Sequence, residues 1–125
     1  MKKVITSKKA PAAIGPYSQA VEINNMVFLS GQLPIDSSTG EFVPGGIKEQ
    51  TTQSLKNIQY ILEEAGLTMN NIVKTTVFLA DISFFSEMNE VYNTFFNDSF
   101  PARSAMAVKT LPKNALVEIE CVAVK

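Results

Sequence analysis

The spacing of apolar residues changes several times along this chain, and these changes limit the folds that it can adopt. In the middle of the chain, apolar residues recur every three or four positions among polar ones, at Leu55, Ile58, Leu62 and Ala65. This is the period of one face of an α-helix, and Gly66 is a typical stop. The pattern predicts an amphipathic helix over residues 47–65.

Most of the remaining chain has the composition of β-strands. Residues 19–23 and 26–32 flank Asn24-Asn25, which tolerates the positive φ of a tight turn, so we expect a hairpin there. Further strands are predicted over residues 72–79, 102–109 and 116–124. A second helix is predicted over residues 83–96, with Asp81 or Ser83 as its cap. The stretch 34–46, which is rich in Pro, Gly and Ser, is interpreted as one ordered loop.

The predicted order of elements is β-β-α-β-α-β-β. We therefore expect residues 1–125 to form a single α+β domain, a mixed sheet with both helices packed on one face.

The last predicted strand alternates an apolar side with a side that carries Glu118 and Glu120 among Leu116, Val122 and Val124. Because that second side is neither fully polar nor fully apolar, we expect a homo-oligomer in which sheets pack together.

Composition excludes several classes of function. The 125 residues are 46% apolar and carry 11 basic against 12 acidic side chains, so we expect neither disorder nor nucleic-acid binding. There is no histidine and one cysteine, which excludes histidine-based triads, Cys/His zinc sites and internal disulfides. We expect no cofactor and no metal.

We find no targeting signal or membrane-spanning stretch, and expect a reduced, cytoplasmic setting without membrane contact.

Two glutamates on the last predicted strand are candidates for acid and base chemistry. Glu118 and Glu120 are two residues apart, so their side chains point to one face at a separation of about 7 Å. Paired carboxylates at such a distance can divide the roles of acid and base. The alternative is a solvated strand face that happens to carry two acids.

Arg103 is the candidate for binding an anion. It begins a strand of small residues, and its planar guanidinium can hold a carboxylate through two parallel hydrogen bonds. The alternative is a structural salt bridge to a glutamate on the neighbouring strand.

Three further residues give weaker signals. Tyr17 follows a Gly-Pro turn just before a strand, where its phenol could meet a ligand or simply be half-buried. Ser30 and Gly31 place a hydroxyl and an accessible backbone amide near a strand end. Cys121 lies on the apolar side of its strand and is interpreted as a packing residue.

The order of these motifs closely resembles the Rid family, the YjgF-like reactive intermediate (imine) deaminases, in its archetypal imine-deaminase branch. The resemblance covers residues 8–124. The motifs that carry it are Ile14-Gly15-Pro16-Tyr17, Ser30-Gly31-Gln32, Met88-Asn89-Glu90, Pro101-Ala102-Arg103-Ser104 and Val117-Glu118-Ile119-Glu120.

The resemblance implies a chorismate-mutase-like fold, a homotrimer with clefts between subunits, and hydrolysis of 2-imino acids to 2-oxo acids. In the matched positions Arg103 would bind the substrate carboxylate and Glu118 would orient or activate the attacking water. Tyr17, Ser30 and Gly31 would line the cleft with Asn89 nearby. Ala105 stands where many relatives carry cysteine, so any contribution from this position would come through its backbone amide.

Two other functions stay open from the sequence. One is a trimeric module that binds 2-oxo acids through Arg103 without turnover. The other is a chorismate-mutase-like enzyme, which fold analogy alone suggests. A dicarboxylate transition state would favour several cations in the cleft, and the sequence offers only Arg103 as an obvious one.

Overall fold

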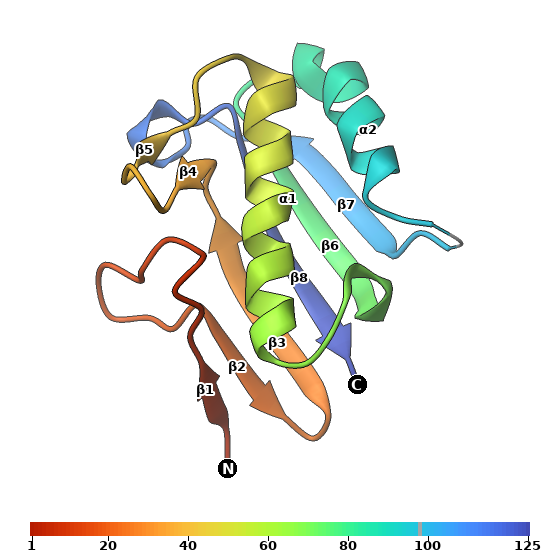
Figure 1. The fold of residues 1–125 in the computed structure, drawn as a ribbon. Helices are drawn as coiled ribbons and strands as arrows, with labels where there is room; N and C mark the ends of the chain where they lie inside the picture. Colours follow the sequence, from red (N-terminus) through yellow and green to blue (C-terminus); the bar gives the residue numbers. More distant parts are fainter. Residues whose placement is uncertain (98) are drawn as a thin grey trace.

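A six-stranded mixed sheet forms the framework of the molecule (Figure 1). The computed structural model describes residues 1–97 and 99–125. The strand order is β1-β2-β3-β8-β6-β7, with β6 and β7 parallel and the other pairs antiparallel. The strands are β1 (Lys3–Ile5), β2 (Ala20–Ile23), β3 (Met26–Gln32), β6 (Ile72–Leu79), β7 (Ala102–Ala107) and β8 (Val117–Val124).

Two helices, α1 (Ile47–Glu64) and α2 (Phe85–Thr94), lie on the same face of this sheet (Figure 1). The apolar face of α1 is fully buried and packs over β3 and β8, as its period predicts. The core under the helix includes Leu55, Ile58, Leu62, Val117 and Ile119. The expected α+β architecture is therefore confirmed. No helix of residues 1–97 and 99–125 is both long and apolar enough to cross a membrane.

Turn chemistry accounts for two element boundaries. Asn24 and Asn25 have φ values of 50° and 64° and join β2 to β3, which confirms the predicted hairpin. Gly66, with φ of 77°, follows the end of α1.

The second helix, α2, is shorter than predicted and begins at Phe85 rather than at residue 83. The Asp81 carboxylate accepts a hydrogen bond from Ser83 N at 2.8 Å. That cap starts a 3-10 turn over Ile82–Phe84, and α2 follows it.

Three short strands were not predicted. β1 pairs with β2 at the edge of the main sheet. β4 (Ile35–Asp36) and β5 (Glu41–Phe42) form a small hairpin, so the interpretation of residues 34–46 as a single loop was wrong. Strands of two or three residues are too short to show a period of two, and tertiary pairing alone identifies them.

The face of the sheet opposite the helices is partly acidic and partly apolar. Along β8, Val117, Ile119, Cys121 and Ala123 are buried beneath the helices, and the residues between them lie on the opposite, open face. Strand pairing extends the open face across the sheet and adds exposed apolar side chains, including Val4, Met26, Phe28 and Met106. The mixed character predicted for this face is confirmed.

Candidate active site

The first candidate cavity lies beside the open face and is called the Glu118 cavity. It has a volume of about 500 Å³. Four of the predicted site residues line it: Tyr17, Ser30, Gly31 and Glu118. Residues that were not predicted as site residues complete the wall, among them Pro11, Ile14, Gln19, Gln32, Pro112 and Lys113.

A bulge in β3 shapes the floor of the Glu118 cavity. Leu29 pairs with Cys121 and Gln32 with Ile119, so the two residues between them oppose one residue of β8. A Cβ atom at Gly31 would lie 2.6 Å from Oε2 of Glu118. Only glycine lets this carboxylate pack so closely against the backbone.

A buried glutamine positions the loop that carries Tyr17. Gln19 Nε2 donates to the carbonyls of Ser7 and Pro11 at 3.1 and 2.8 Å, and its Oε1 accepts from Ser7 N at 2.7 Å. Ser30 adds a second attachment, because its Oγ donates to the Ser18 carbonyl at 2.7 Å. The Tyr17 side chain itself is half exposed at the cavity mouth. Gln19 was missed because nothing in a single sequence marks a glutamine as buried.

The electrostatics of Glu118 suit proton exchange. Partial burial raises the pKa of Glu118 above its usual value, and the negative charge of Glu120 raises it further. Within the described part of the chain, no side chain or backbone amide donates a hydrogen bond to the Glu118 carboxylate. A carboxylate with a raised pKa and free oxygens is a stronger base than an ordinary glutamate.

The second candidate cavity lies between α2 and the edge strand β7 and is called the Arg103 cavity. Its volume is about 460 Å³, and Asn89, Tyr92, Asn93, Phe100, Pro101 and Arg103 line it. Arg103 Nη1 donates to Asn89 Oδ1 at 2.7 Å. Its Cζ lies 4.8 Å from the ring centroid of Tyr92 and 5.3 Å from that of Phe85.

Arg103 makes no salt bridge with any carboxylate of residues 1–97 or 99–125. The residue opposite it on the neighbouring strand is Thr75, so the alternative of a salt bridge to a strand glutamate is wrong. Ala105 lies two residues further along the same face of β7, half-buried and packed against the core.

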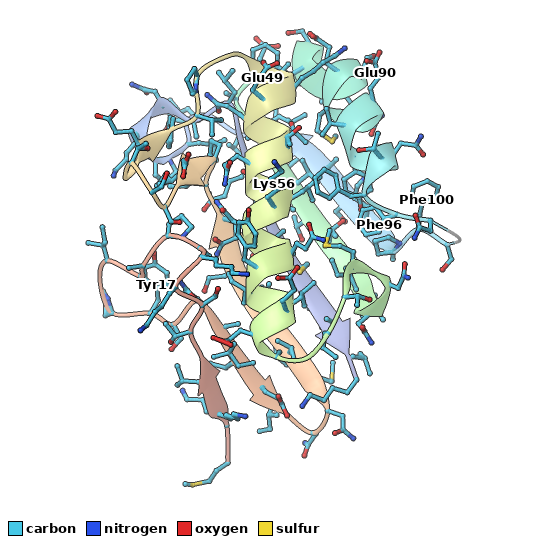
Figure 2. The ribbon with its side chains drawn as sticks, in the orientation of Figure 1. Tyr17, Glu49, Lys56, Glu90, Phe96 and Phe100 are labelled. Atoms are coloured by element: carbon cyan, nitrogen blue, oxygen red, sulfur yellow. The ribbon has the colours of Figure 1, made fainter. Side chains whose placement is uncertain are left out.

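The two cavities do not meet within one chain. On β6, Thr75 pairs with Arg103 and Phe78 pairs with Glu118. Because these two β6 residues are three apart, Arg103 and Glu118 point to opposite faces of the sheet. Tyr17 and Phe100, one from each cavity, lie on opposite sides of the molecule in Figure 2. Each chain thus brings Tyr17 together with Glu118, and keeps Arg103 apart from both.

The aromatic residues around Arg103 were missed by the sequence interpretation. Neither Tyr92 nor Phe85 was predicted as a site residue. A signal was present, because Phe85, Asn89 and Tyr92 follow the i, i+4, i+7 spacing of one helix face. That spacing does not by itself show that an arginine of a β-strand packs against this face of the helix.

Comparison with known proteins identifies the family. The model of the Endoribonuclease L-PSP family matches residues 7–125. The chain belongs to this family, which is the YjgF/Rid family. The resemblance carried by the sequence motifs is therefore confirmed.

Similar proteins include relatives with different names. The 2-iminobutanoate/2-iminopropanoate deaminase of Mus musculus is 52% identical over 125 residues, covering 100% of this chain and 93% of that protein. A RutC family protein of Pyrococcus abyssi is 53% identical over 124 residues, covering 99% and 98%. The E. coli TdcF structure with bound serine has a TM-score of 0.94 at 44% identity, covering 98% of each chain. The structure of the E. coli YjgF gene product has a TM-score of 0.95 at 48% identity, with the same coverage.

Proposed function

We propose that this Rid-family protein hydrolyses 2-imino acids, and their enamine tautomers, to 2-oxo acids and ammonia. The deaminase name of relatives about half identical over the whole chain supports this proposal. The residues of the two cavities support it independently. Arg103 offers a cation that has no carboxylate partner among residues 1–97 and 99–125, and Glu118 offers a carboxylate with a raised pKa.

The proposed reaction uses these residues in sequence. Arg103 holds the substrate carboxylate, with Asn89 beside it. Glu118 takes a proton from water as the water oxygen bonds to the imine carbon, and it passes this proton to the imine nitrogen. In the resulting tetrahedral carbinolamine the hydroxyl proton moves through Glu118 to the nitrogen, the C–N bond breaks, and ammonia leaves the 2-oxo acid. The imine carbon is already electrophilic, so orientation and proton transfer are sufficient chemistry.

Tyr17, Ser30 and Gly31 line the side of the cleft where water meets the substrate in this proposal. The Ser30 hydroxyl already donates its proton to Ser18, so it would present only an acceptor to the substrate or water. The phenol of Tyr17 is half exposed at the cavity mouth, where it could meet a ligand. Ala105 would contribute only through its backbone.

The observation that carries the proposal is the placement of Arg103 and Glu118 on opposite faces of one sheet. One substrate molecule can meet both groups only if a second copy of the chain brings its Arg103 cavity to the Glu118 cavity of the first. The exposed apolar side chains of the open face favour such contact. We propose a homotrimer with shared sites, and a 13.7 kDa monomer by light scattering would contradict it.

The test is a coupled assay with a serine/threonine dehydratase that depends on pyridoxal phosphate. The dehydratase releases 2-imino acids from serine or threonine, and 2-oxo acid and ammonia are followed with and without this protein. We expect a faster conversion with the parent protein and little acceleration with Glu118→Gln. Pyruvate binding without acceleration would favour the non-catalytic module.

The name of the family includes an endoribonuclease activity. A parallel incubation with single-stranded RNA tests this activity, and we expect no cleavage.

A further inference from the structure

Helix α2 presents a ring, an amide and a second ring to the guanidinium of Arg103. Phe85, Asn89 and Tyr92 occupy one helix face over two turns. The two ring centroids lie 5.3 and 4.8 Å from Cζ of Arg103, within the range of cation–π attraction. Asn89 accepts a hydrogen bond from Nη1 between them.

The Tyr92 ring is fixed to the sheet rather than free to move. Its hydroxyl lies 2.7 Å from Oγ1 of Thr75, in a hydrogen bond in which either oxygen can be the donor. Both residues are buried, and Thr75 is the residue opposite Arg103 on the neighbouring strand. The hydrogen bond therefore sets the position of the ring relative to the backbone that carries Arg103.

The contacts of Phe85, Asn89 and Tyr92 hold the Arg103 guanidinium without bringing a negative charge to it. A carboxylate in the position of Tyr92 would pair with Arg103 and compete with an anionic substrate. An aromatic face attracts the guanidinium and uses none of its five N–H donors. Asn89 uses one donor, so a two-pronged hydrogen bond to a substrate carboxylate stays available.

We propose that Tyr92 is a positioning residue for substrate binding: its ring, anchored through Thr75 and assisted by Phe85, orients the Arg103 guanidinium toward the substrate carboxylate. This inference rests on the proposed function, in which Arg103 binds that carboxylate.

Four variants test the proposal, with pyruvate as the probe and calorimetry as the measurement. Tyr92→Leu removes the ring and keeps an apolar side chain, and we expect a loss of pyruvate affinity of about tenfold, the scale of a partly desolvated cation–π contact. Tyr92→Phe keeps the ring and removes the hydroxyl that anchors it to Thr75, so we expect an affinity between those of the parent and Tyr92→Leu. Phe85→Leu should lose about threefold, because it removes the more distant ring.

Phe96→Leu is the matched control. The Phe96 ring is buried and its centroid lies 4.9 Å from that of Tyr92, so this variant makes the same kind of change in the same aromatic cluster. Phe96 is not among the rings that face Arg103. We expect unchanged pyruvate affinity in assembled Phe96→Leu protein. Parent-like affinity in both Tyr92→Leu and Phe85→Leu, or an equal loss in the control, would overturn the proposal.

Kinetics separate this role from catalysis. We expect Tyr92→Leu to raise KM with little change in kcat, since the carboxylate grip acts in the ground state and the transition state alike. A loss confined to kcat would overturn the proposal. Pyruvate binding by a parent that does not hydrolyse imines would overturn the deaminase activity alone, and the affinity comparison would still decide the role of Tyr92. A parent that does not bind pyruvate would overturn both.

Discussion

The Arg103 cavity and the Glu118 cavity hold their charged groups in different ways. Arg103 carries a permanent charge and is held by aromatic rings and an amide. Glu118 can gain and lose a proton, and it packs against the bare backbone of Gly31. The first arrangement suits the binding of an anion, and the second suits proton transfer. Because they occupy opposite faces of the sheet, each chain holds two separate halves of the proposed site.

Substitution of Glu118 gives the largest expected effect. Glu118→Gln keeps the shape of the side chain and removes the proton acceptor, so imine hydrolysis should fall by about 10²-fold or more. Pyruvate affinity should change far less, because Arg103, which is proposed to hold its carboxylate, is left in place. Turnover and calorimetry on the same preparation measure both. Parent-like hydrolysis by Glu118→Gln would show that the Glu118 cavity has no role in proton transfer.

Substitution of Arg103 should impair binding as well as turnover. Arg103→Ala removes the charge-assisted hydrogen bonds to the substrate carboxylate. The free energy of pyruvate binding should weaken by roughly 1.5–3 kcal/mol, and hydrolysis should fall too. Arg103→Lys keeps the charge and loses the planar fork, so its affinity should lie between those of the parent and Arg103→Ala. Titration calorimetry gives the affinities. Equal binding by all three proteins would show that Arg103 does not bind pyruvate.

The pH dependence of hydrolysis should reflect the raised pKa of Glu118. Activity should fall with decreasing pH at a midpoint above the usual pKa of glutamate, because protonation removes the base. Glu120→Gln should move this midpoint to lower pH, since the charge of Glu120 raises the pKa of Glu118, and should be milder than Glu118→Gln at neutral pH. Profiles of kcat/KM against pH measure both. An unchanged midpoint in Glu120→Gln would contradict the coupling.

The same pKa shift affects stability with a defined sign. The folded protein holds the Glu118 proton more tightly than the unfolded chain, whose glutamate has the ordinary pKa of 4.5. The Glu118 contribution is therefore most favourable below that value and is lost as pH rises through the raised folded pKa. Glu118→Gln removes this penalty, so at pH 7 it should unfold at the same or a higher temperature than the parent. A lower Tm would indicate that the carboxylate makes stabilising contacts.

Substitution of Cys121 gives the smallest expected effect. The thiol faces the core, and burial raises its pKa to about 12, with a further contribution from Glu120. Cys121→Ala should lower the free energy of unfolding by about 1 kcal/mol, as the loss of a small buried group does. Turnover per assembled protein should be unchanged. Loss of hydrolysis in correctly assembled Cys121→Ala protein would place the thiol in the mechanism.

Local patterns in the sequence were sufficient for most of the fold. The helical period before Gly66 and the Asn24-Asn25 turn both predicted elements that the structure confirms. The alternation along β8 also predicted which side carries Glu118 and which carries Cys121. These features depend on neighbours within one segment. β1 and the β4–β5 hairpin depend on pairing between very short segments, so no local period marks them.

The candidate site was less predictable than the fold. Motif order grouped Tyr17, Glu118, Arg103 and Asn89 as one set, and the structure divides them between two cavities. That division depends on strand order and pairing register, which place Thr75 beside Arg103 and Phe78 beside Glu118. A single sequence contains no direct record of that register.

Mixing two impaired variants tests the shared site most directly. Arg103→Ala and Glu118→Gln proteins are unfolded together, or co-expressed, and allowed to assemble at random. If each site takes Arg103 from one copy and Glu118 from another, about a quarter of the sites in the mixture are intact, and about a quarter of the parent activity should return. The separate variants, assembled alone, provide the baseline. No activity above that baseline, in a mixture whose mixed assembly is verified by mass, would contradict the shared site.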